Sequence, residues 1–396
     1  MNCQLLQQVI AQNQQLTESI QQQLNQINET GQASKNQLQQ LENSLAEALA
    51  QSEQTLTTFA PEFKEAFNLL ETCEYSDNIK GFNNNIYTTL QLADGRVLVT
   101  GKNGEICFFR HQLDGNLKYS YEIGGFGDNA IFTTLQLADG RVLVAGEKGE
   151  ARLLQPQPDG SYKYSNKIKC SNNDIFTTLQ LADGRVLVAG DYSETRLFQP
   201  QPDGILKYSG KVKGFKNNIF TTLQLADGNI LVAGDFGETR LFQPQPDGIL
   251  KYSDNIEGFG NNAIRTVLQL VDGSVLAAGS GGETRLLQPQ PDGSYKWSDK
   301  IEGFNNNIFT TLQLANGDVL VAGSGGETRF LQRQPDGILK YSDDEIEGFD
   351  HVIFTTLQLA NGYILVTGGK GETRLLQPRF VRQAQDVRNR VEEILK

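Results

Sequence analysis

Runs of alternating apolar and polar residues recur along most of the chain at a fixed spacing. One copy, IFTTLQLADGRVLVAG at residues 131–146, occurs with small changes seven times between residues 86 and 368. Each copy is followed by further short apolar runs, separated by Gly, Asn or Asp-Gly turn signals, which predicts four strands per repeat. The turn glycines lie 44 or 45 residues apart: Gly95, Gly140, Gly184, Gly228, Gly273, Gly317 and Gly362.

One repeat illustrates the expected blade. Its strands are predicted at residues 219–225, 229–234, 238–244 and 249–256. The second run is apolar on both faces, as in a strand buried between two neighbouring sheets, and the later runs are more polar. Asp-Gly and Pro-Asp-Gly connections favour hairpins. The pattern predicts an all-β, seven-bladed β-propeller of four-stranded blades, although a parallel solenoid also has a fixed period.

The two ends of the repeat array are complementary. Residues 75–82 have the sequence of a fourth strand without its blade, and the last repeat stops after its third strand, at residues 371–378. We therefore expect the N-terminal strand to complete the final blade, which removes two open sheet edges. The propeller is predicted to span residues 75–378.

Helical periodicity flanks the propeller on both sides. Residues 1–74 carry apolar positions at an approximately 3.5-residue period among many Gln residues, which predicts a helical, coiled-coil-like head. This head packs on itself or on the propeller, or it forms an oligomerisation or partner-docking arm. Residues 379–396 are predicted to form a C-terminal helix.

Composition limits the partners and the cellular compartment expected for the chain. A net charge of −12 disfavours a nucleic-acid partner, and no apolar run approaches the length of a membrane span. The first residues lack a secretory signal, and the four cysteines have no paired spacing, which fits a reducing compartment. We expect a cytoplasmic protein, or one delivered by a specialised secretion system without a cleavable signal.

The repeats resemble those of the WD-repeat family. A Gly-Phe pair before the first strand stands where that family has Gly-His, for example at Gly214-Phe215, and the Asp-Gly turn and the strand split between the termini match as well. The third strand ends in Leu-Gln-Pro or Phe-Gln-Pro instead of Trp-Asp, and the run QLADGRVLVAG is equally similar to kelch-type repeats. The resemblance covers residues 75–378 and implies a closed propeller.

A Gly-Glu-Thr-Arg turn recurs before the third strand. Glu and Arg two residues apart share one face of a strand, so we expect each pair to form a structural tie between blades, with ligand contact or catalysis as alternatives. The first copy has Glu105 followed by Cys107 in place of the arginine. The six complete pairs are Glu150 and Arg152, Glu194 and Arg196, Glu238 and Arg240, Glu283 and Arg285, Glu327 and Arg329, and Glu372 and Arg374.

Two further sets of residues are candidates for ligand or partner binding on the same rim. The first lies in the Asn-rich loops before each first strand, where Asn is also an ordinary turn residue. The second is the residue near the start of that strand, which otherwise packs in the core. The sets are Asn84, Asn129, Asn173, Asn218, Asn262, Asn306 and His351, and Tyr87, Phe132, Phe176, Phe220, Arg265, Phe309 and Phe354.

Catalytic chemistry finds little support in the sequence. There are two histidines, and no metal-ligand spacing, nucleophile elbow or phosphate loop. We therefore predict no enzymatic activity, cofactor or metal. The first hypothesis is a protein–protein interaction scaffold, whose head oligomerises the chain or docks a partner. The alternative is a multivalent lectin-like propeller that binds a carbohydrate or small polar ligand through its repeated rim loops.

Overall fold

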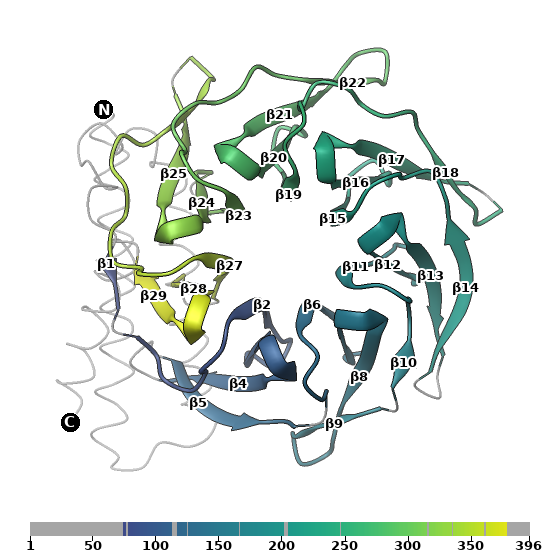
Figure 1. Ribbon diagram of the computed structural model, residues 1–396, viewed down its shortest axis with the longest axis vertical. Helices are drawn as coiled ribbons and strands as arrows, with labels where there is room; N and C mark the ends of the chain where they lie inside the picture. Colours follow the sequence, from purple (N-terminus) through teal and green to yellow (C-terminus); the bar gives the residue numbers. More distant parts are fainter. Residues whose placement is uncertain are drawn as a thin grey trace, which may run out of the picture. The chain divides into compact units, whose positions relative to one another are not determined.

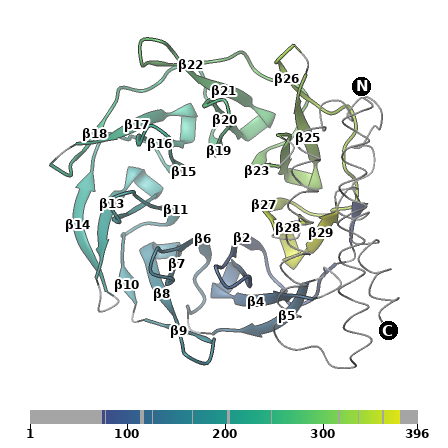
Figure 2. The same cartoon turned by 180° about the vertical axis from the view of Figure 1, so that it is seen from behind.

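The computed structural model describes residues 74–377, apart from residues 77, 113–116, 125, 166, 202–204, 246, 315–316, 335 and 360–361. Seven antiparallel sheets are arranged around a ring, one sheet per sequence repeat (Figure 1; Figure 2 shows the opposite side). The predicted all-β, seven-bladed propeller of four-stranded blades is confirmed. The predicted helical head and C-terminal helix lie outside the described residues.

Each blade begins at the centre of the ring. The innermost strands are six residues long: β2 (Ile86–Gln91), β6 (Ile131–Gln136), β11 (Ile175–Gln180), β15 (Ile219–Gln224), β19 (Ile264–Gln269), β23 (Ile308–Gln313) and β27 (Ile353–Gln358). The second strands are β3 (Val97–Gly101), β7 (Val142–Gly146), β12 (Val186–Gly190), β16 (Ile230–Gly234), β20 (Val275–Gly279), β24 (Val319–Gly323) and β28 (Ile364–Gly368).

A three-residue 3-10 turn connects the second strand to the third. These turns are η1 (Lys102–Gly104), η2 (Glu147–Gly149), η3 (Asp191–Ser193), η4 (Asp235–Gly237), η5 (Ser280–Gly282), η6 (Ser324–Gly326) and η7 (Gly369–Gly371). The third strands are β4 (Ile106–His111), β8 (Glu150–Pro156), β13 (Thr195–Pro200), β17 (Thr239–Pro244), β21 (Thr284–Pro289), β25 (Thr328–Arg333) and β29 (Thr373–Gln377).

The outer strands are shorter and less regular. They are β5 (Leu117–Glu122), β9 (Tyr162–Tyr164) with β10 (Ile168–Lys169), β14 (Leu206–Val212), β18 (Leu250–Tyr252), β22 (Tyr295–Trp297), β26 (Leu339–Tyr341) and β1 (Glu74–Tyr75). The fourth strand predicted at residues 249–256 is β18, which ends at Tyr252. Ser253 ends the regular pairing, because its Oγ accepts from Leu241 N and donates to Asp254 O before Ile256 N bonds Thr239 O.

The hydrophobic core lies between neighbouring blades. Every residue of each second strand is buried, as its continuous apolar run predicts. One such cluster joins Leu187 and Ala189 of β12 to Ile230 and Val232 of β16. The second strand ends in glycine because a Cβ on Gly234 would lie 1.8 Å from the carbonyl oxygen of Asn218. Burial on both faces therefore means that each second strand packs against the blades on either side.

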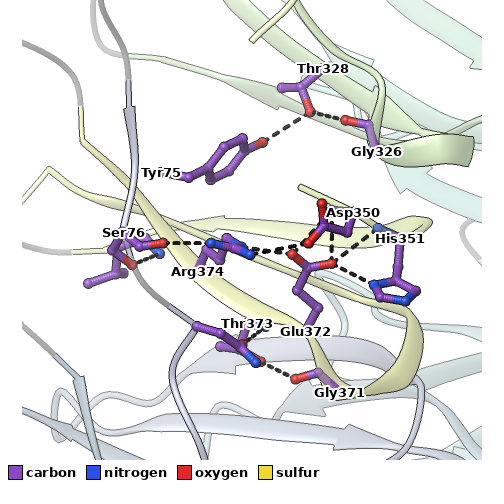
Figure 3. A network of polar contacts seen from close by, with 12 residues as sticks. Tyr75, Ser76, Gly326, Thr328, Asp350, His351, Gly371, Glu372, Thr373 and Arg374 are labelled. Atoms are coloured by element: carbon purple, nitrogen blue, oxygen red, sulfur yellow. Dashed lines mark hydrogen bonds and ion pairs between the residues drawn. The ribbon is translucent and has the colours of Figure 1, made fainter. Parts of the chain in front are cut away.

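The first described strand closes the ring. β1 pairs antiparallel with β29, so the last blade has the order β1-β29-β28-β27, and the predicted closure is confirmed. The pairing continues beyond β1, because Ser76 N donates to Leu375 O at 2.8 Å and Ile79 N to Thr373 O at 2.7 Å. Figure 3 shows Arg374 Nη1 donating to Ser76 O and Tyr75 Oη bonded to Thr328 in the preceding blade. Residues 298 positions apart in the sequence thus share one blade.

The helices in the described part of the chain are three-residue turns, and none is long and apolar enough to cross a membrane.

Candidate functional site

The 3-10 turns and the loops that precede the innermost strands lie on one side of the ring, which we call the turn rim. The repeated Glu joins these two elements. In the fourth blade, Oε2 of Glu238 accepts from Lys216 N, Asn217 N and Asn217 Nδ2 at 3.0, 3.1 and 2.9 Å. The equivalent side-chain donors are Asn84 to Glu105, Asn129 to Glu150, Asn173 to Glu194, Asn262 to Glu283 and Asn306 to Glu327, with His351 Nδ1 bonded to Glu372. These amides anchor the loops.

The predicted rim residue Asn218 belongs to a different set. It lies one position after Asn217, and its Oδ1 accepts from Tyr192 N of the preceding blade at 2.9 Å. The same contact between neighbouring blades is made by Asn85 with Lys370 N, by Asp174 with Lys148 N and by Asn307 with Gly281 N. The fourth loop therefore has its Glu ligand at Asn217, and Asn218 fastens two blades together.

The repeated arginines complete the same network. Arg240 Nε donates to Glu238 Oε1 at 2.9 Å, and its Nη1 donates to Ser253 O at 2.9 Å. The other five predicted pairs also form, in blades two, three, five, six and seven. Both partners belong to one blade, so the expectation of a tie between blades is wrong. Figure 3 shows the seventh blade, where Glu372 lies between Arg374 and His351.

The first blade lacks the arginine and is arranged differently. Cys107 is buried there and its Sγ lies 3.4 Å from Gly81 O. Glu105 is half-buried, whereas the six glutamates with an arginine partner are buried. Burial raises the pKa of the Cys107 thiol to about 12, so the thiol is protonated at neutral pH.

Three of the buried carboxylates, those of Glu150, Glu194 and Glu372, have a pKa below the usual value of a glutamate. Burial alone raises the pKa of Glu194, but hydrogen bonds from Ser171 and Arg196 outweigh it and hold the pKa at about 2. Burial also raises the pKa of Glu150, but hydrogen bonds from Lys167 and Arg152 outweigh it and lower the pKa. In Glu372, hydrogen bonds from Arg374 and His351 outweigh burial in the same way. A carboxylate that is fully ionised and fully hydrogen-bonded is suited to holding loops in place.

The seven predicted residues near the start of the innermost strands form a collar around the ring. Each is the extra residue of a β-bulge, as in β11, where Ile175 and Thr177 pair with β12 and Phe176 is skipped. The rings of Tyr87, Phe132, Phe176 and Phe220 follow one another with centroids 5.3 to 5.6 Å apart. Phe354 continues the series, 5.1 Å from Tyr87 and 5.4 Å from Phe309.

Arg265 in the fifth blade interrupts the collar. Its guanidinium lies 4.1 Å from the centre of the Phe220 ring, and its enclosed Nε has no hydrogen-bond partner within the described ranges. Burial lowers the pKa of Arg265, although an arginine remains protonated at neutral pH.

A second circle of side chains is interrupted at the same place. Threonine hydroxyls bond one another between neighbouring innermost strands, as in Thr177 with Thr222 at 2.9 Å, at six of the seven junctions. At the junction of blades four and five, Val267 stands where the partner of Thr221 would be. The fifth blade therefore departs from the repeat twice.

Two exposed aromatic residues at the tips of the third and fourth turns were not among the residues predicted from the sequence. The middle residue of each turn has a left-handed backbone, and in most copies it is Asn, Gly or Lys. Tyr192 and Phe236 hold this position with φ of 51° and 55°, and their side chains are 74% and 65% exposed. The signal was present in the alignment of the seven repeats, since two adjacent turns carry aromatics where the others do not.

These departures are contiguous. Tyr192 N bonds Asn218, which immediately precedes β15 and Phe220. Phe220 contacts Arg265, and Arg265 is attracted by Asp235, the neighbour of Phe236 in η4. We call Tyr192, Phe220, Phe236 and Arg265 the blade 3–5 patch. Three of its four residues, Tyr192, Phe236 and Arg265, differ from the residues that most repeats have at these positions.

In the part of the chain that the structure describes, no group of three or more His, Cys, Asp and Glu side chains is placed to hold a metal ion. Cys107 and Cys170 are free and buried, and burial raises the pKa of Cys170 to about 12 as well. Neither thiol is therefore a ready nucleophile.

Comparison with known proteins finds a similarity in fold. No protein-family model matches the chain. No curated protein matches it at a significant level. Among solved structures, the crystal structure of the WD40 β-propeller domain of Doa1 is similar, with a TM-score of 0.61 and 16% sequence identity over 77% of this chain and 97% of that chain. This likeness confirms that the chain has a WD-repeat-like propeller fold.

Proposed function

We propose that this chain is a non-catalytic protein-interaction scaffold that docks a protein partner on the blade 3–5 patch. The observation that carries the proposal is the pair of exposed aromatics at Tyr192 and Phe236. Both side chains project from adjacent turns, and both hold a backbone conformation that a bulky residue adopts only at a free-energy cost.

The chemistry of the patch supports a protein partner. Aromatic residues and arginine contribute most of the binding energy in protein interfaces. An aromatic side chain at an exposed left-handed position does not help folding, because it neither buries its ring nor relaxes the backbone. Retention of two such residues side by side is therefore better explained by binding than by stability.

The multivalent lectin-like alternative receives less support. That hypothesis requires seven loops with amide groups free to bind a sugar. Six Asn amides donate to the Glu of their own blade, and His351 occupies the same place in the seventh. Because these donors are bonded within their own blades, the loops favour a single asymmetric binding surface over seven equivalent sugar sites.

The remaining parts of the proposal concern the head and the location. We place oligomerisation or a second docking function in residues 1–74, on their apolar periodicity. The free, buried Cys107 and Cys170 support a reducing compartment such as the cytoplasm.

The test compares proteins captured by the full chain and by variants. The double variant Tyr192→Asn, Phe236→Asn removes both rings and places at each position a residue that tolerates the turn, as Asn103 does in the first blade. The matched control is Lys148→Asn with Lys370→Asn, at the same turn position of blades two and seven. We expect a partner that is captured by the wild type and the control and lost from the double variant. A glycan array that binds the full chain, with capture unaffected by the double variant, would favour the lectin-like alternative.

A further inference from the structure

We propose that the partner segment presents an acidic side chain to Arg265, between apolar side chains that pack on Tyr192 and Phe236. This inference rests on the proposed function and specifies the chemistry of the partner. A peptide with Asp or Glu flanked by aromatic or aliphatic residues has the complementary composition.

The first argument is the state of Arg265. The six arginines of the Glu pairs each have a carboxylate within hydrogen-bond distance. Arg265 is half-buried against Phe220, and its enclosed Nε has no hydrogen-bond partner in the part of the chain that the structure describes. A guanidinium in such a place is stabilised by a carboxylate that bonds two of its N–H groups at once.

The second argument is that the neighbouring carboxylate does not satisfy it. Asp235 attracts Arg265 electrostatically, but its Oδ2 accepts from Asn218 Nδ2 at 3.0 Å. Asp191, in the adjacent turn, has a raised pKa, first because of burial and then because Asp174 and Asp235 are close. Asp174, Asp191 and Asp235 thus repel one another, and the hydrogen bonds described for Asp235 include none from Arg265.

The third argument is a second cation beside η4. Lys216 is exposed, and its backbone N–H bonds Glu238, the residue that follows η4. Lys216 is the only cation at its position in the seven loops, where the other residues are Asn83, Asp128, Asn172, Asn261, Asn305 and Asp350. Two cations therefore flank the turn that carries Phe236, in a chain with a net charge of −12. A single acidic side chain fits these two cations, whereas Asp191 and Asp235 would repel a longer acidic run.

The arrangement also explains why the collar is broken. Phenylalanine at position 265 would continue the aromatic series, as in five of the other copies, and would need no counterion. Arginine at this position replaces the ring–ring contacts of the collar by a contact with Phe220, and its Nε has no hydrogen-bond partner among the described residues. A carboxylate supplied by another protein would neutralise the charge that the arginine introduces.

The test uses a random dodecapeptide library displayed with its C-terminus fused, so that only side-chain carboxylates are available. The full chain is panned, and enriched peptides are titrated against wild type, Arg265→Phe and Val267→Thr. Arg265→Phe introduces the side chain that five other copies have at this position. Val267→Thr is the control, because it changes the same strand, β19, at a position in the circle of threonine hydroxyls. We expect peptides with Asp or Glu between apolar residues, binding at least tenfold more weakly to Arg265→Phe and unchanged to Val267→Thr. Arg265→Lys should bind with intermediate affinity, because it keeps the charge without the fork.

Two results would overturn the inference and are distinguishable from each other. Enriched peptides that are neutral or basic, that bind Arg265→Phe as well as wild type and that are lost with Tyr192→Asn, Phe236→Asn would refute the acidic chemistry and leave the docking surface standing. Peptides that bind both variants as well as the wild type, or the absence of any enriched peptide, would refute the surface as well. Circular dichroism and unfolding midpoints of each variant establish that it is folded.

Discussion

In four of the seven turns the middle residue has a left-handed backbone and is neither Gly nor Asn, and in two of these it is aromatic. Tyr192 and Phe236 have positive φ without the freedom of glycine or the local hydrogen bonding of asparagine. We expect Phe236→Asn to raise the free energy of unfolding by about 0.5–1 kcal/mol, since the ring is 65% exposed and little burial is lost. Urea denaturation measures this, with Lys370→Asn as the control at an equivalent turn. A loss of stability in Phe236→Asn alone would mean that the ring packs against the propeller.

The carboxylate of Glu194 makes the stability of the fold depend on pH. The pKa of Glu194 falls from its usual 4.5 to about 2 in the folded protein. The folded form therefore holds fewer protons than the unfolded chain in this range, and the stabilisation is complete above pH 4.5 and lost as the pH falls toward 2. Glu150 and Glu372 shift in the same direction. Glu194→Gln should reduce the decline in urea midpoint between pH 5 and 2, and an unchanged pH profile would contradict this assignment.

Residue-scale prediction from the sequence succeeded where partners are close along the chain. Glu and Arg two positions apart face the same way on a strand, and the six pairs form. The contact of Asn217 with Glu238 was not predicted, because an amide 21 residues before its carboxylate finds its partner only through the path of the loop. Whether a given Asn anchors a loop or binds a ligand depends on that path, and the sequence alone leaves both open.

At the scale of the blade, the Glu–Arg network holds one loop and two strands. Arg240 is 7% exposed and Glu238 is 5% exposed. Arg240→Ala leaves a buried carboxylate without its main counterion and Ser253 O without a donor, and should cost about 2–4 kcal/mol. Arg333→Ala is the control, since Arg333 and Asp272 form an ion pair with side chains 44% and 46% exposed, which should cost less than about 1 kcal/mol. Similar losses in thermal denaturation for the two variants would argue against a structural role of the buried pair.

The elements differ in how far the sequence determines them. The first three strands of each blade were predictable, because hairpin turns and continuous apolar runs are local signals. The fourth strand was predicted too long at residues 249–256. Past Tyr252 the hydroxyl of Ser253 accepts from Leu241 N and donates to Asp254 O, and alternation of apolar residues continues without regular pairing.

At the scale of the whole molecule, one strand from the start of the array completes the ring. Ser76→Pro in the full chain removes the N–H that bonds Leu375 O and should lower the stability by about 2 kcal/mol or more. Ser253→Pro removes the equivalent bond to Leu241 O in an uninterrupted blade and serves as the comparison. We expect both to lower the thermal unfolding midpoint. A fall for Ser253→Pro alone would mean that the closing strand contributes little to the stability of the ring.

The closed ring was predictable from the sequence, whereas the asymmetry of its rim was not. Complementary deficits at the two ends of the array are visible as soon as the repeats are aligned. The substitutions at positions 192, 236 and 265 are scattered along the sequence, and each is an ordinary variation within its own repeat. The alignment of the repeats places them in consecutive blades, and only the fold shows that both aromatic side chains are exposed and that Arg265 Nε has no hydrogen-bond partner among the described residues.

The central claim is that one patch of the turn rim binds a partner. Hydrogen exchange of the full chain, with and without the captured partner, tests it most directly. The account predicts protection confined to η3, η4, the loop at residues 213–218 and the start of β19. Protection repeated in all seven loops, or confined to surfaces away from blades three to five, would contradict it.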